Sequence, residues 1–325
     1  MATTNKVKTI GVLTSGGDAP GMNAAIRAAV RRGLQKGVQM KGILKGYDGL
    51  MNEEIIDMTA RDVSDTIERG GTILYTARCA EMRTLEGQKR AADVCRKHGI
   101  DGLVVIGGDG SFRGARDLTG AGVPCIGVPG TIDNDISSSE YTIGYDTAMN
   151  TAMEMIDKLR DTSQSHDRCS VVEVMGRNAG WIALNVAIAS GAIACITPEM
   201  PYDMNAIAEK IKKAHEAQKE HFIVVVAEGV NNSEGITKGI QELTGIETRL
   251  TVLGHVQRGG MPTLRDRVAA SQMGYRAVEL IDSGATNRVV GMKDNKIIDV
   301  DIQEALAMKK PFDTELYRVC NEITF

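Results

Sequence analysis

Two acidic loops contain the residues whose types and spacing are best suited to chemistry. One reads Gly-Gly-Asp-Gly-Ser at residues 107–111 and the other reads Thr-Ile-Asp-Asn-Asp at 131–135, each after a short apolar run. Loops that leave the carboxyl ends of strands are where open α/β sheets bind ligands. Asp109, flanked by glycines that let a phosphate approach the backbone, is suited to a divalent cation. Asp133 and Asp135 are suited to accepting a hydroxyl proton, so the two loops indicate phosphoryl transfer to an alcohol.

A third loop, residues 14–21, joins an apolar run to a helical pattern and reads Thr-Ser-Gly-Gly-Asp-Ala-Pro-Gly. Free backbone N–H groups and the helix dipole favour an anion at such a turn. The loop is not a Walker A motif, because Met22 and Asn23 stand where a Lys-Ser/Thr pair is required, and it lacks the dinucleotide fingerprint. A tight strand-to-helix turn without a ligand is the alternative.

Further along the chain, four residues indicate groups that bind phosphate or sugar. Arg177 lies in the glycine-containing segment 175–180, and an arginine on such a turn is suited to neutralising a phosphate. Glu228 follows an apolar run and is suited to polar substrate groups. His255 and Arg258, three apart between glycines, are suited to a phosphate dianion.

Each of these sites also has a purely structural interpretation. Asp109 would then cap a helix that begins near Ser111. Residues 131–135 would form an Asx-rich turn, Arg177 would be a surface side chain, and His255 would be structural. The glycines around Asp109 and the polar residues that follow the 131–135 loop favour binding sites instead.

The composition fits a soluble globular protein with two domains. The chain has 325 residues, 42% of them hydrophobic and 25% charged, enough for two domains of ~150 residues each. A net charge of −4 argues against broad nucleic-acid binding. We expect no membrane span and a cytoplasmic location, because no apolar stretch reaches ~18 residues and the amino terminus lacks a signal-peptide core. The six scattered cysteines form no C-x-x-C pair and indicate small core residues.

Short apolar runs alternate with longer helical patterns, which predicts an α/β fold with a mainly parallel sheet. The expected strands are 9–13, 39–44, 102–106, 125–128, 170–174, 194–196 and 222–227. The expected helices are 22–36, 84–98, 114–121, 146–160, 181–190 and 205–220. A change of domain is expected around residues 143–146.

Together these segments closely resemble the bacterial 6-phosphofructokinases. Five motifs in the same order carry the resemblance, which extends from about residue 9 to residue 312. The motifs occupy residues 16–21, 107–111, 129–135, 175–177 and 255–260. The resemblance implies that ATP, with Mg²⁺, phosphorylates the 1-hydroxyl of fructose 6-phosphate in the committed step of glycolysis.

The resemblance assigns roles to individual residues of this chain. The implied catalytic set is Asp133 as general base with Thr131, Asp135, Arg78, Arg177 and Gly17. The implied nucleotide set is Gly17, Tyr47, Arg78, Cys79, Arg83, Gly108, Asp109, Gly110, Ser111 and Gly114, with Asp109 also the magnesium ligand. The implied substrate set is Thr131, Ile132, Asp133, Arg168, Met175, Gly176, Arg177, Glu228, Arg249, His255 and Arg258.

The resemblance also implies two Rossmann-like three-layer α/β/α domains with mainly parallel sheets and an active-site cleft between them. The ATP-binding domain would comprise residues 1–144 and 257–307, and the fructose 6-phosphate-binding domain residues 145–256 and 308–325. A homotetramer is expected, in which Arg168 and Arg249 reach into a neighbouring subunit's phosphate pocket.

The phosphoryl donor is inferred from the size of two side chains. Pyrophosphate-dependent relatives tend to carry aspartate at the position of Gly110 and lysine at that of Gly130, and those side chains fill the space for an α-phosphate. Two glycines leave that space open and favour ATP. The alternatives are a pyrophosphate-dependent enzyme, a lipid or NAD kinase with a Gly-Gly-Asp-Gly loop, and a catalytically inactive sugar-phosphate sensor.

The effector site is where the chain departs from the family pattern. The matching residues are Arg27, Arg31, Asp65, Arg160 and Lys219. Ile193 stands where a glutamate usually coordinates the effector's Mg²⁺, and Ala217 and Ala60 replace basic residues. Because an apolar side chain cannot coordinate a metal, we expect activation by ADP to be weak or absent, and strong relief of phosphoenolpyruvate inhibition by ADP would contradict this. The sequence does not explain Trp181, where aspartate is common in close relatives.

Overall fold

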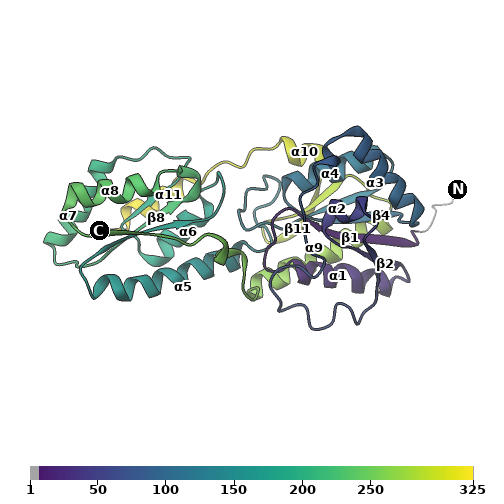
Figure 1. The fold of residues 1–325 in the computed structure, drawn as a ribbon, viewed down its shortest axis with the longest axis horizontal. Helices are drawn as coiled ribbons and strands as arrows, with labels where there is room; N and C mark the ends of the chain where they lie inside the picture. Colours follow the sequence, from purple (N-terminus) through teal and green to yellow (C-terminus); the bar gives the residue numbers. More distant parts are fainter. Residues whose placement is uncertain (1–6, 325) are drawn as a thin grey trace. The chain divides into compact units, whose positions relative to one another are not determined.

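The computed structural model describes residues 7–324, and its contacts divide the chain into two compact units. The first unit consists of Met1–Ile132, Ile136–Thr147 and Arg258–Lys310, and the second of Asp133–Asp135, Ala148–Gln257 and Pro311–Phe325. Each unit has its own sheet with helices packed on it (Figure 1). The expected α/β fold class is confirmed, whereas the domain ranges and the ligand expected for each domain stay predictions.

The first unit is built on a seven-stranded sheet with the order β11-β10-β5-β4-β1-β2-β3. Its strands are β1 (Thr9–Ser15), β2 (Gln39–Ile43), β3 (Ile55–Met58), β4 (Gly102–Gly107), β5 (Cys125–Pro129), β10 (Arg288–Lys293) and β11 (Lys296–Asp301). The inner strands are parallel, and β3 and β11 pair antiparallel at the two edges. Strands β1 and β4 are buried along their whole length, which explains their apolar sequences.

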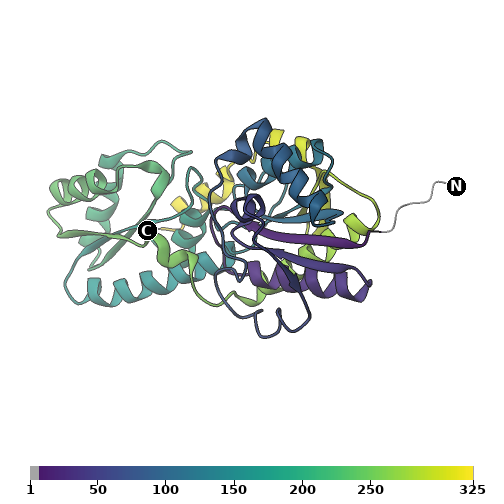
Figure 2. The same ribbon diagram turned by 45° about the vertical axis from the view of Figure 1, so that its right-hand side comes forward.

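Helices cover both faces of this sheet (Figure 2). They are α1 (Met22–Gln35), α2 (Gly46–Met51), α3 (Leu85–Lys97), α4 (Asp109–Gly120), α9 (Leu264–Asp282) and α10 (Ile302–Ala307), with a 3₁₀ turn η1 (Glu81–Arg83). One core joins the sheet to α2, α3 and α4 through side chains such as Leu50, Ala91 and Leu118. The opposite face packs against α1 and α9. Burying one leucine side chain such as Leu50 contributes ~1.5–3 kcal/mol.

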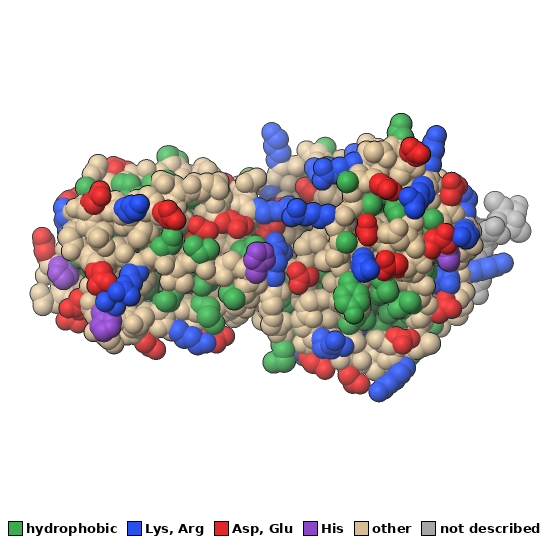
Figure 3. Space-filling model, viewed as in Figure 1, with side chains coloured by type: hydrophobic (Ala, Val, Ile, Leu, Met, Phe, Trp, Pro, Cys, Tyr) green, Lys and Arg blue, Asp and Glu red, His purple; other side chains and the backbone are tan. Residues whose placement is uncertain are grey.

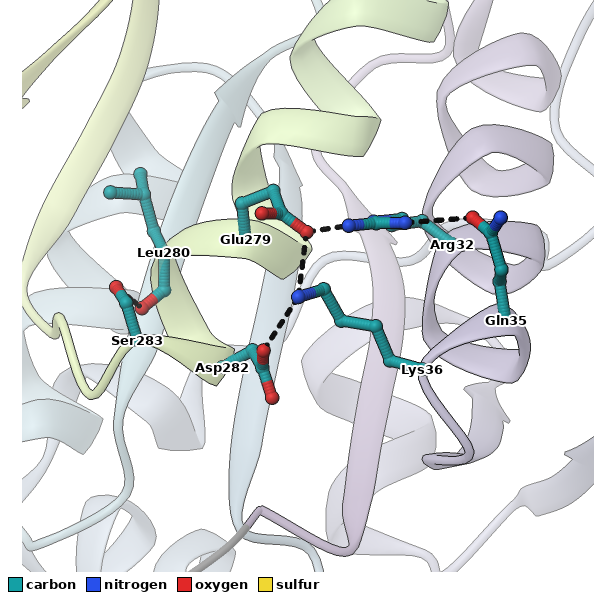
Figure 4. Close-up of polar contacts among 7 residues, drawn as sticks. All are labelled: Arg32, Gln35, Lys36, Glu279, Leu280, Asp282 and Ser283. Carbon is teal, nitrogen blue, oxygen red and sulfur yellow. Dashed lines mark hydrogen bonds and ion pairs between the residues drawn. The ribbon is translucent and has the colours of Figure 1, made fainter. Parts of the chain in front are cut away.

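Helices α1 and α9 pack closely against each other. An added Cβ at Gly274 would lie 2.3 Å from a backbone oxygen of α1, so glycine is required at this approach. The polar network in Figure 4 joins the ends of the two helices: the Arg32 guanidinium donates to Glu279 at 2.7 Å, and the Lys36 ammonium lies 3.1 Å from the same carboxylate. These ion pairs are partly exposed, so apolar packing contributes more to the stability of this helix pair.

The second unit has a four-stranded, fully parallel sheet with the order β7-β8-β6-β9. Its strands are β6 (Cys169–Val174), β7 (Ala194–Ile196), β8 (Phe222–Ala227) and β9 (Thr248–Val252). Its helices are α5 (Tyr145–Gln164), α6 (Trp181–Ser190), α7 (Met204–Glu216), α8 (Ser233–Thr244) and α11 (Thr314–Glu322), with the 3₁₀ turns η2 (Glu228–Val230) and η3 (Gly254–Arg258). The first three residues of α5 and the last residue of η3 are assigned to the first unit. Val171 and Val224 of the sheet form a core with Ile211 of α7 and Ile240 of α8.

Trp181 packs against the C-terminal segment of the second unit. Its ring lies 5.6 Å from that of Phe312, and the ring of Phe312 lies 5.9 Å from that of Tyr317 in α11. Aromatic pairs at such distances contribute about 0.5–1.5 kcal/mol beyond the burial of their surface. The tryptophan that the sequence left unexplained therefore has a packing role, since it helps to hold α11 against α6.

The expected strands are all present within a few residues, but one helix starts earlier than predicted. The helix expected over 114–121 begins at Asp109, so that boundary is wrong. Its buried face, which includes Phe112 and Leu118, outweighs the poor helix propensity of its three glycines. The sequence patterns after residue 227 predict no elements, yet the structure has helices α8 to α11 and strands β9 to β11 there.

The surface of the described residues shows no large single-sign region on the face that is drawn. Acidic and basic side chains are interspersed there (Figure 3). Within residues 7–324, no helix combines the length and the apolar character needed to cross a membrane. Five of the six cysteines are buried, as expected for small core residues, and Cys79 is partly exposed.

Candidate active site

Three of the predicted loops begin side by side at one edge of the first unit's sheet. Parallel pairing places Ser15 of β1 beside Gly107 of β4, and Gly107 beside Pro129 of β5. The Ser111 hydroxyl donates a hydrogen bond to the backbone oxygen of Ser15 at 3.0 Å. An added Cβ at Gly107 would lie 2.4 Å from that same oxygen, so glycine is required where the loops meet. The register of the strands therefore assembles the predicted loops.

The first glycine-rich loop leaves an open helix N-terminus. Gly16 and Gly21 adopt positive φ angles of 90° and 102°, a conformation that favours glycine. Gly21 precedes α1, no side chain caps that helix, and its first turn has no acidic residue. Uncapped N–H groups and the helix dipole attract an anion at such an end. This geometry supports phosphate binding more than it supports a turn without a ligand.

Arg258 lies beside this first loop. Its Nη1 donates to the backbone oxygen of Asp18 at 3.2 Å, and an added Cβ at Gly17 would lie only 2.7 Å from the same nitrogen. Any larger residue at position 17 would therefore displace the guanidinium. The absence of a side chain at Gly17 brings a positive charge next to a helix end that is already suited to phosphate. Contact of Arg258 with the sugar 6-phosphate stays a prediction.

Asp109 is the first residue of α4. The N-cap position belongs to Gly108, so the interpretation of Asp109 as a helix cap is wrong. The carboxylate is partly buried at the positive end of the helix dipole, which stabilises its negative charge. An added Cβ at Gly108 or Gly110 would meet no atom within 4 Å, so there is open space at the two glycines that flank Asp109.

The residues around Asp109 fit a magnesium ion that is held partly by a ligand. Mg²⁺ is usually bound by one or two carboxylates together with substrate phosphates, and seldom by a cage of protein groups alone. Among residues 7–324 there is no group of three or more His, Cys, Asp or Glu side chains that could form such a cage. A single carboxylate beside two open glycines suits an ion shared with a nucleotide.

Tyr47 supports the Asp109 loop through buried contacts. Its hydroxyl donates to the backbone oxygen of Ser111 at 2.6 Å, and its ring occupies the space that a Cβ on Gly114 would need. Burial raises the pKa of Tyr47 well above its usual value, so the phenol remains a donor. Ile132 is also 0% exposed, backbone included, so its expected contact with the substrate stays a prediction.

The segment that carries Arg78, Cys79 and Arg83 is tied to the first glycine-rich loop. The Thr76 hydroxyl donates to the backbone oxygen of Gly16 at 2.7 Å. Both arginines are exposed, whereas Cys79 packs partly against the core of the first unit. The hydrogen bond places this arginine-bearing segment near the helix end that is suited to phosphate.

In the second unit, Asp133 and Asp135 face Arg177. The Nε of Arg177 lies 3.5 Å from Oδ2 of Asp133, and its Nη1 lies 3.9 Å from Oδ2 of Asp135. The side chain of Asp133 is 3% exposed and that of Arg177 is 68% exposed. A buried carboxylate is thus paired with an arginine that reaches solvent. This arrangement can accept a hydroxyl proton and stabilise the negative charge that develops on a transferred group.

Two side chains hold the turn that carries Arg177. Oε1 of Glu228 accepts from the backbone N–H of Gly176 at 3.0 Å and from that of Arg177 at 2.6 Å. Oε1 of Gln257, which is fully buried, accepts from the N–H of Met175 at 2.8 Å. Glu228 was expected only to contact substrate, and Gln257 was not predicted. The only sign in the sequence that Gln257 has a role is its position between His255 and Arg258 in one motif.

The same turn borders an open polar pocket of about 460 Å³. The residues that line it are Glu173, Arg177, Asn178, Glu228, Gly229 and Asn231. An added Cβ at Gly229 would lie 2.3 Å from the backbone oxygen of Arg177, so glycine is required here. Carboxylates accept hydrogen bonds from hydroxyl groups and arginine binds anions, so the pocket suits a sugar phosphate.

Replacing Glu228 with alanine is expected to lower kcat/KM by roughly 10–100-fold, because the Arg177 turn loses the acceptor that fixes it. Glu228→Gln keeps an oxygen acceptor and is expected to retain most of the activity. Steady-state kinetics on both variants measures the difference. An equal loss in the two variants would show that the negative charge of Glu228, and not its hold on the turn, is what the reaction needs.

Arg168 and Arg249 lie together in the second unit, one on each side of Glu247. The Nε of Arg168 is 2.9 Å from Oε2 of Glu247, and Arg249 donates from Nε to Oε1 at 2.8 Å. Contacts with Arg168 first, and then with Arg249, lower the pKa of Glu247. The sequence motifs did not point to Glu247.

His255 lies on η3 with an exposed ring.

The expected effector residues are divided between the two units. Arg27, Arg31 and Asp65 belong to the first unit, and Arg160 and Lys219 to the second. Burial, and then the positive charges of Arg160 and Lys219, lower the pKa of His221. Burial and Arg160 likewise lower the pKa of Lys219. These three residues form a basic cluster suited to an anion, and the histidine in it was not predicted.

Ile193 is 1% exposed and packs in the core of the second unit. A carboxylate at this place would be surrounded by apolar side chains, so the local environment matches isoleucine and not a metal ligand. Asp65 pairs with Arg61 at 3.7 Å, whereas Ala60 and Ala217 are exposed. These features support the expected weak activation by ADP, which stays a prediction.

These features define a class of protein, the α/β proteins that carry out phosphate chemistry. The features are glycine-rich loops at the ends of parallel strands, an open helix N-terminus, and a buried carboxylate paired with an arginine. Residues 9–281 match the family model described as phosphofructokinase. The chain belongs to the phosphofructokinase family.

Its similarity to known proteins extends over nearly the whole chain. An ATP-dependent 6-phosphofructokinase from Clostridium botulinum is 57% identical over 313 residues, which cover 96% of this chain and 98% of the relative. One from Clostridium tetani is 55% identical over 319 residues, covering 98% and 100%. The solved phosphofructokinase of Saccharomyces cerevisiae superposes with a TM-score of 0.91 at 33% identity over 98% of this chain. This chain spans 50% of the yeast chain's length.

Proposed function

We propose that this chain is an ATP-dependent 6-phosphofructokinase of glycolysis. It transfers the γ-phosphoryl group of ATP to the 1-hydroxyl of fructose 6-phosphate and yields fructose 1,6-bisphosphate and ADP. A bond forms between the 1-oxygen and the γ-phosphorus while the bond from that phosphorus to the β–γ bridging oxygen breaks. The hydroxyl proton goes to Asp133. The names and the 55–57% identity of the Clostridium relatives support this assignment.

The observation that carries the proposal is the contact of the buried Asp133 carboxylate with the Arg177 guanidinium at 3.5 Å. Asp133 acts as the general base, and Arg177 stabilises the charge of the transferred group. Positioning and electrostatics supply most of the catalysis in such reactions, so further groups also contribute. In this proposal they are Thr131, Asp135, Arg78 and Gly17.

ATP and Mg²⁺ are the cosubstrate and the metal in this proposal. When bound, Mg²⁺ neutralises phosphate charge, and Asp109 is the protein group that would hold it. At Gly110 an added Cβ would meet nothing within 4 Å, so the space for an α-phosphate is open. At Gly130 an added Cβ would already lie 3.0 Å from side-chain atoms of Ile106 and Met22, so a lysine there would need rearrangement. Both features favour ATP over pyrophosphate.

Seven residues bind the sugar phosphate in this proposal. Met175, Gly176 and Glu228 contact the sugar, and His255, Arg258, Arg168 and Arg249 bind the 6-phosphate. We assign Arg168 and Arg249 to a neighbouring subunit's site in a cytoplasmic homotetramer. An apolar stripe on and before α9 supports subunit contacts, because such exposed patches usually mark interfaces. It consists of Met261, Leu264, Val268 and Tyr275, which are 45–78% exposed.

A coupled assay for fructose 1,6-bisphosphate tests the proposal. The protein is given fructose 6-phosphate and Mg²⁺ with either ATP or pyrophosphate, and turnover with ATP alone is expected. Turnover with pyrophosphate alone would keep the site and overturn the argument from Gly110 and Gly130. No turnover with either donor, in a sample that still binds fructose 6-phosphate, would instead indicate a sugar-phosphate sensor.

A further inference from the structure

We infer that Glu247 positions Arg168 and Arg249 for the phosphate of the sugar substrate. Its carboxylate contacts both guanidiniums, at 2.9 Å and 2.8 Å. The inference deepens the proposed function and rests on it, since there both arginines bind the 6-phosphate. Glu247 is a positioning residue in this scheme, because it acts on the substrate only through the arginines.

The sheet of the second unit fixes the place of this carboxylate. The backbone oxygen of Glu247 accepts from the N–H of Cys169 at 3.0 Å, just where β6 begins to pair with β9. Arg168 precedes Cys169 and so lies across from Glu247. Arg249 is two residues beyond Glu247, and alternate residues of a strand share one face. The strand register therefore brings one carboxylate between two arginines that are 81 residues apart in the sequence.

The contacts leave donors available for a phosphate. Glu247 forms an ion pair with the Nε of Arg168, and it contacts both the Nε and the Nη2 of Arg249. Both terminal nitrogens of Arg168 and one of Arg249 remain, and among residues 7–324 neither arginine pairs with another carboxylate. A guanidinium held by one edge is oriented and loses less freedom when it binds a second anion. Two arginines and one glutamate also retain one net positive charge.

The exposure of the cluster sets the size of the expected effect. The side chains of Arg168, Glu247 and Arg249 are 21%, 48% and 61% exposed, so solvent screens their attraction. Losing the glutamate should therefore weaken binding of the sugar phosphate several-fold and not abolish it. We expect the KM for fructose 6-phosphate to rise about fivefold, which corresponds to ~1 kcal/mol.

The test compares Glu247→Gln with Glu53→Gln in the full chain. Glu53 is a matched control, because it is also a surface carboxylate held by two basic side chains, those of Lys97 and His98. With saturating Mg-ATP, Glu247→Gln should raise the KM for fructose 6-phosphate about fivefold and leave kcat and the KM for ATP within about twofold. Glu53→Gln should leave the KM for fructose 6-phosphate at the wild-type value.

A second measurement repeats Glu247→Gln in a background that lacks both arginines, so that the glutamate has no side chain to position. In a variant with Arg168→Ala and Arg249→Ala, adding Glu247→Gln should change the KM no further, because the three groups act as one unit. A further rise in that background would show that Glu247 acts by another route and would overturn the inference. A fall in kcat together with the rise in KM in the single variant Glu247→Gln would also overturn the inference.

The outcomes separate this inference from the proposed function. If the arginine variants raise the KM for fructose 6-phosphate but Glu247→Gln does not, the phosphate pocket stands and the inference alone fails. A lower KM in Glu247→Gln would mean that the glutamate competes with the phosphate, which also overturns it. If neither Arg168→Ala nor Arg249→Ala changes the KM, the assignment of these arginines fails and the inference falls with it.

Discussion

Replacing Asp133 with serine is expected to lower kcat by roughly 10²–10⁴-fold while fructose 6-phosphate still binds. Serine cannot accept the proton of the 1-hydroxyl at neutral pH, whereas the 6-phosphate contacts are made by other residues. The carboxylate is 3% exposed and lies within 3.5 Å of Arg177, so water is a poor substitute for it. Steady-state kinetics gives kcat, and titration calorimetry gives the affinity for fructose 6-phosphate.

Asp157→Ser is a suitable control for this variant, because Asp157 is an exposed aspartate on α5 outside the proposed site. Its activity should equal that of the wild type, and thermal unfolding should show both variants folded. A kcat for Asp133→Ser within about tenfold of the wild type would mean that Asp133 is not the general base. Loss of binding in a folded variant would assign Asp133 to substrate binding instead.

Replacing Asp266 with alanine is expected to lower the free energy of unfolding by about 4 kcal/mol, because several buried donors lose their acceptor at once. Oδ1 of Asp266 accepts from the Tyr141 hydroxyl at 2.5 Å and from the Gly144 N–H at 2.7 Å. Oδ2 accepts from the N–H and the hydroxyl of Thr147 at 2.9 Å and 2.5 Å. Thermal unfolding should show the loss as a Tm lower by roughly 10 °C.

Asp282→Ala is the control for this stability measurement. Asp282 is a partly exposed aspartate on the same helix and pairs with Lys36, so its loss should cost less than about 1 kcal/mol.

Burial raises the pKa of Asp266. The wild type should therefore lose stability from this group as the pH rises from ~4, the unfolded value, through the raised pKa. Asp266→Ala should lack that dependence, and equal Tm values for the two variants would contradict the buried-acceptor argument.

The parallel strands and the glycine loops could be predicted because their signals are local. Strands buried on both faces need continuous Val, Ile and Leu, and β1 and β4 have such runs. Glycine is required at position 107 because another part of the backbone approaches closely there, and it is favoured at position 21 because the φ angle is positive. The carboxylates and glycines of these loops are the residue types that phosphate chemistry requires, so the sequence alone indicates that chemistry.

The supporting groups could not be predicted because their contacts are not local. Gln257 accepts from Met175, 82 residues away, and Asp266 accepts from Tyr141, 125 residues away. Their positions depend on strand register and helix packing, which no short pattern encodes. The start of α4 at Asp109 was missed for a related reason, since burial of its apolar face overrides the local preference of glycine.

Trp181 is the only tryptophan among the chain's 325 residues, and it lies against Phe312 at the place where the C-terminal segment packs on α6. Light absorbed selectively by indole is therefore emitted from this single neighbourhood, although the chain also has seven tyrosines. An aromatic side chain that leaves its partner becomes more hydrated, and the emission of an indole moves to longer wavelength in water. The chain thus contains its own optical probe for the docking of α11, and detachment of this helix can be followed without any label.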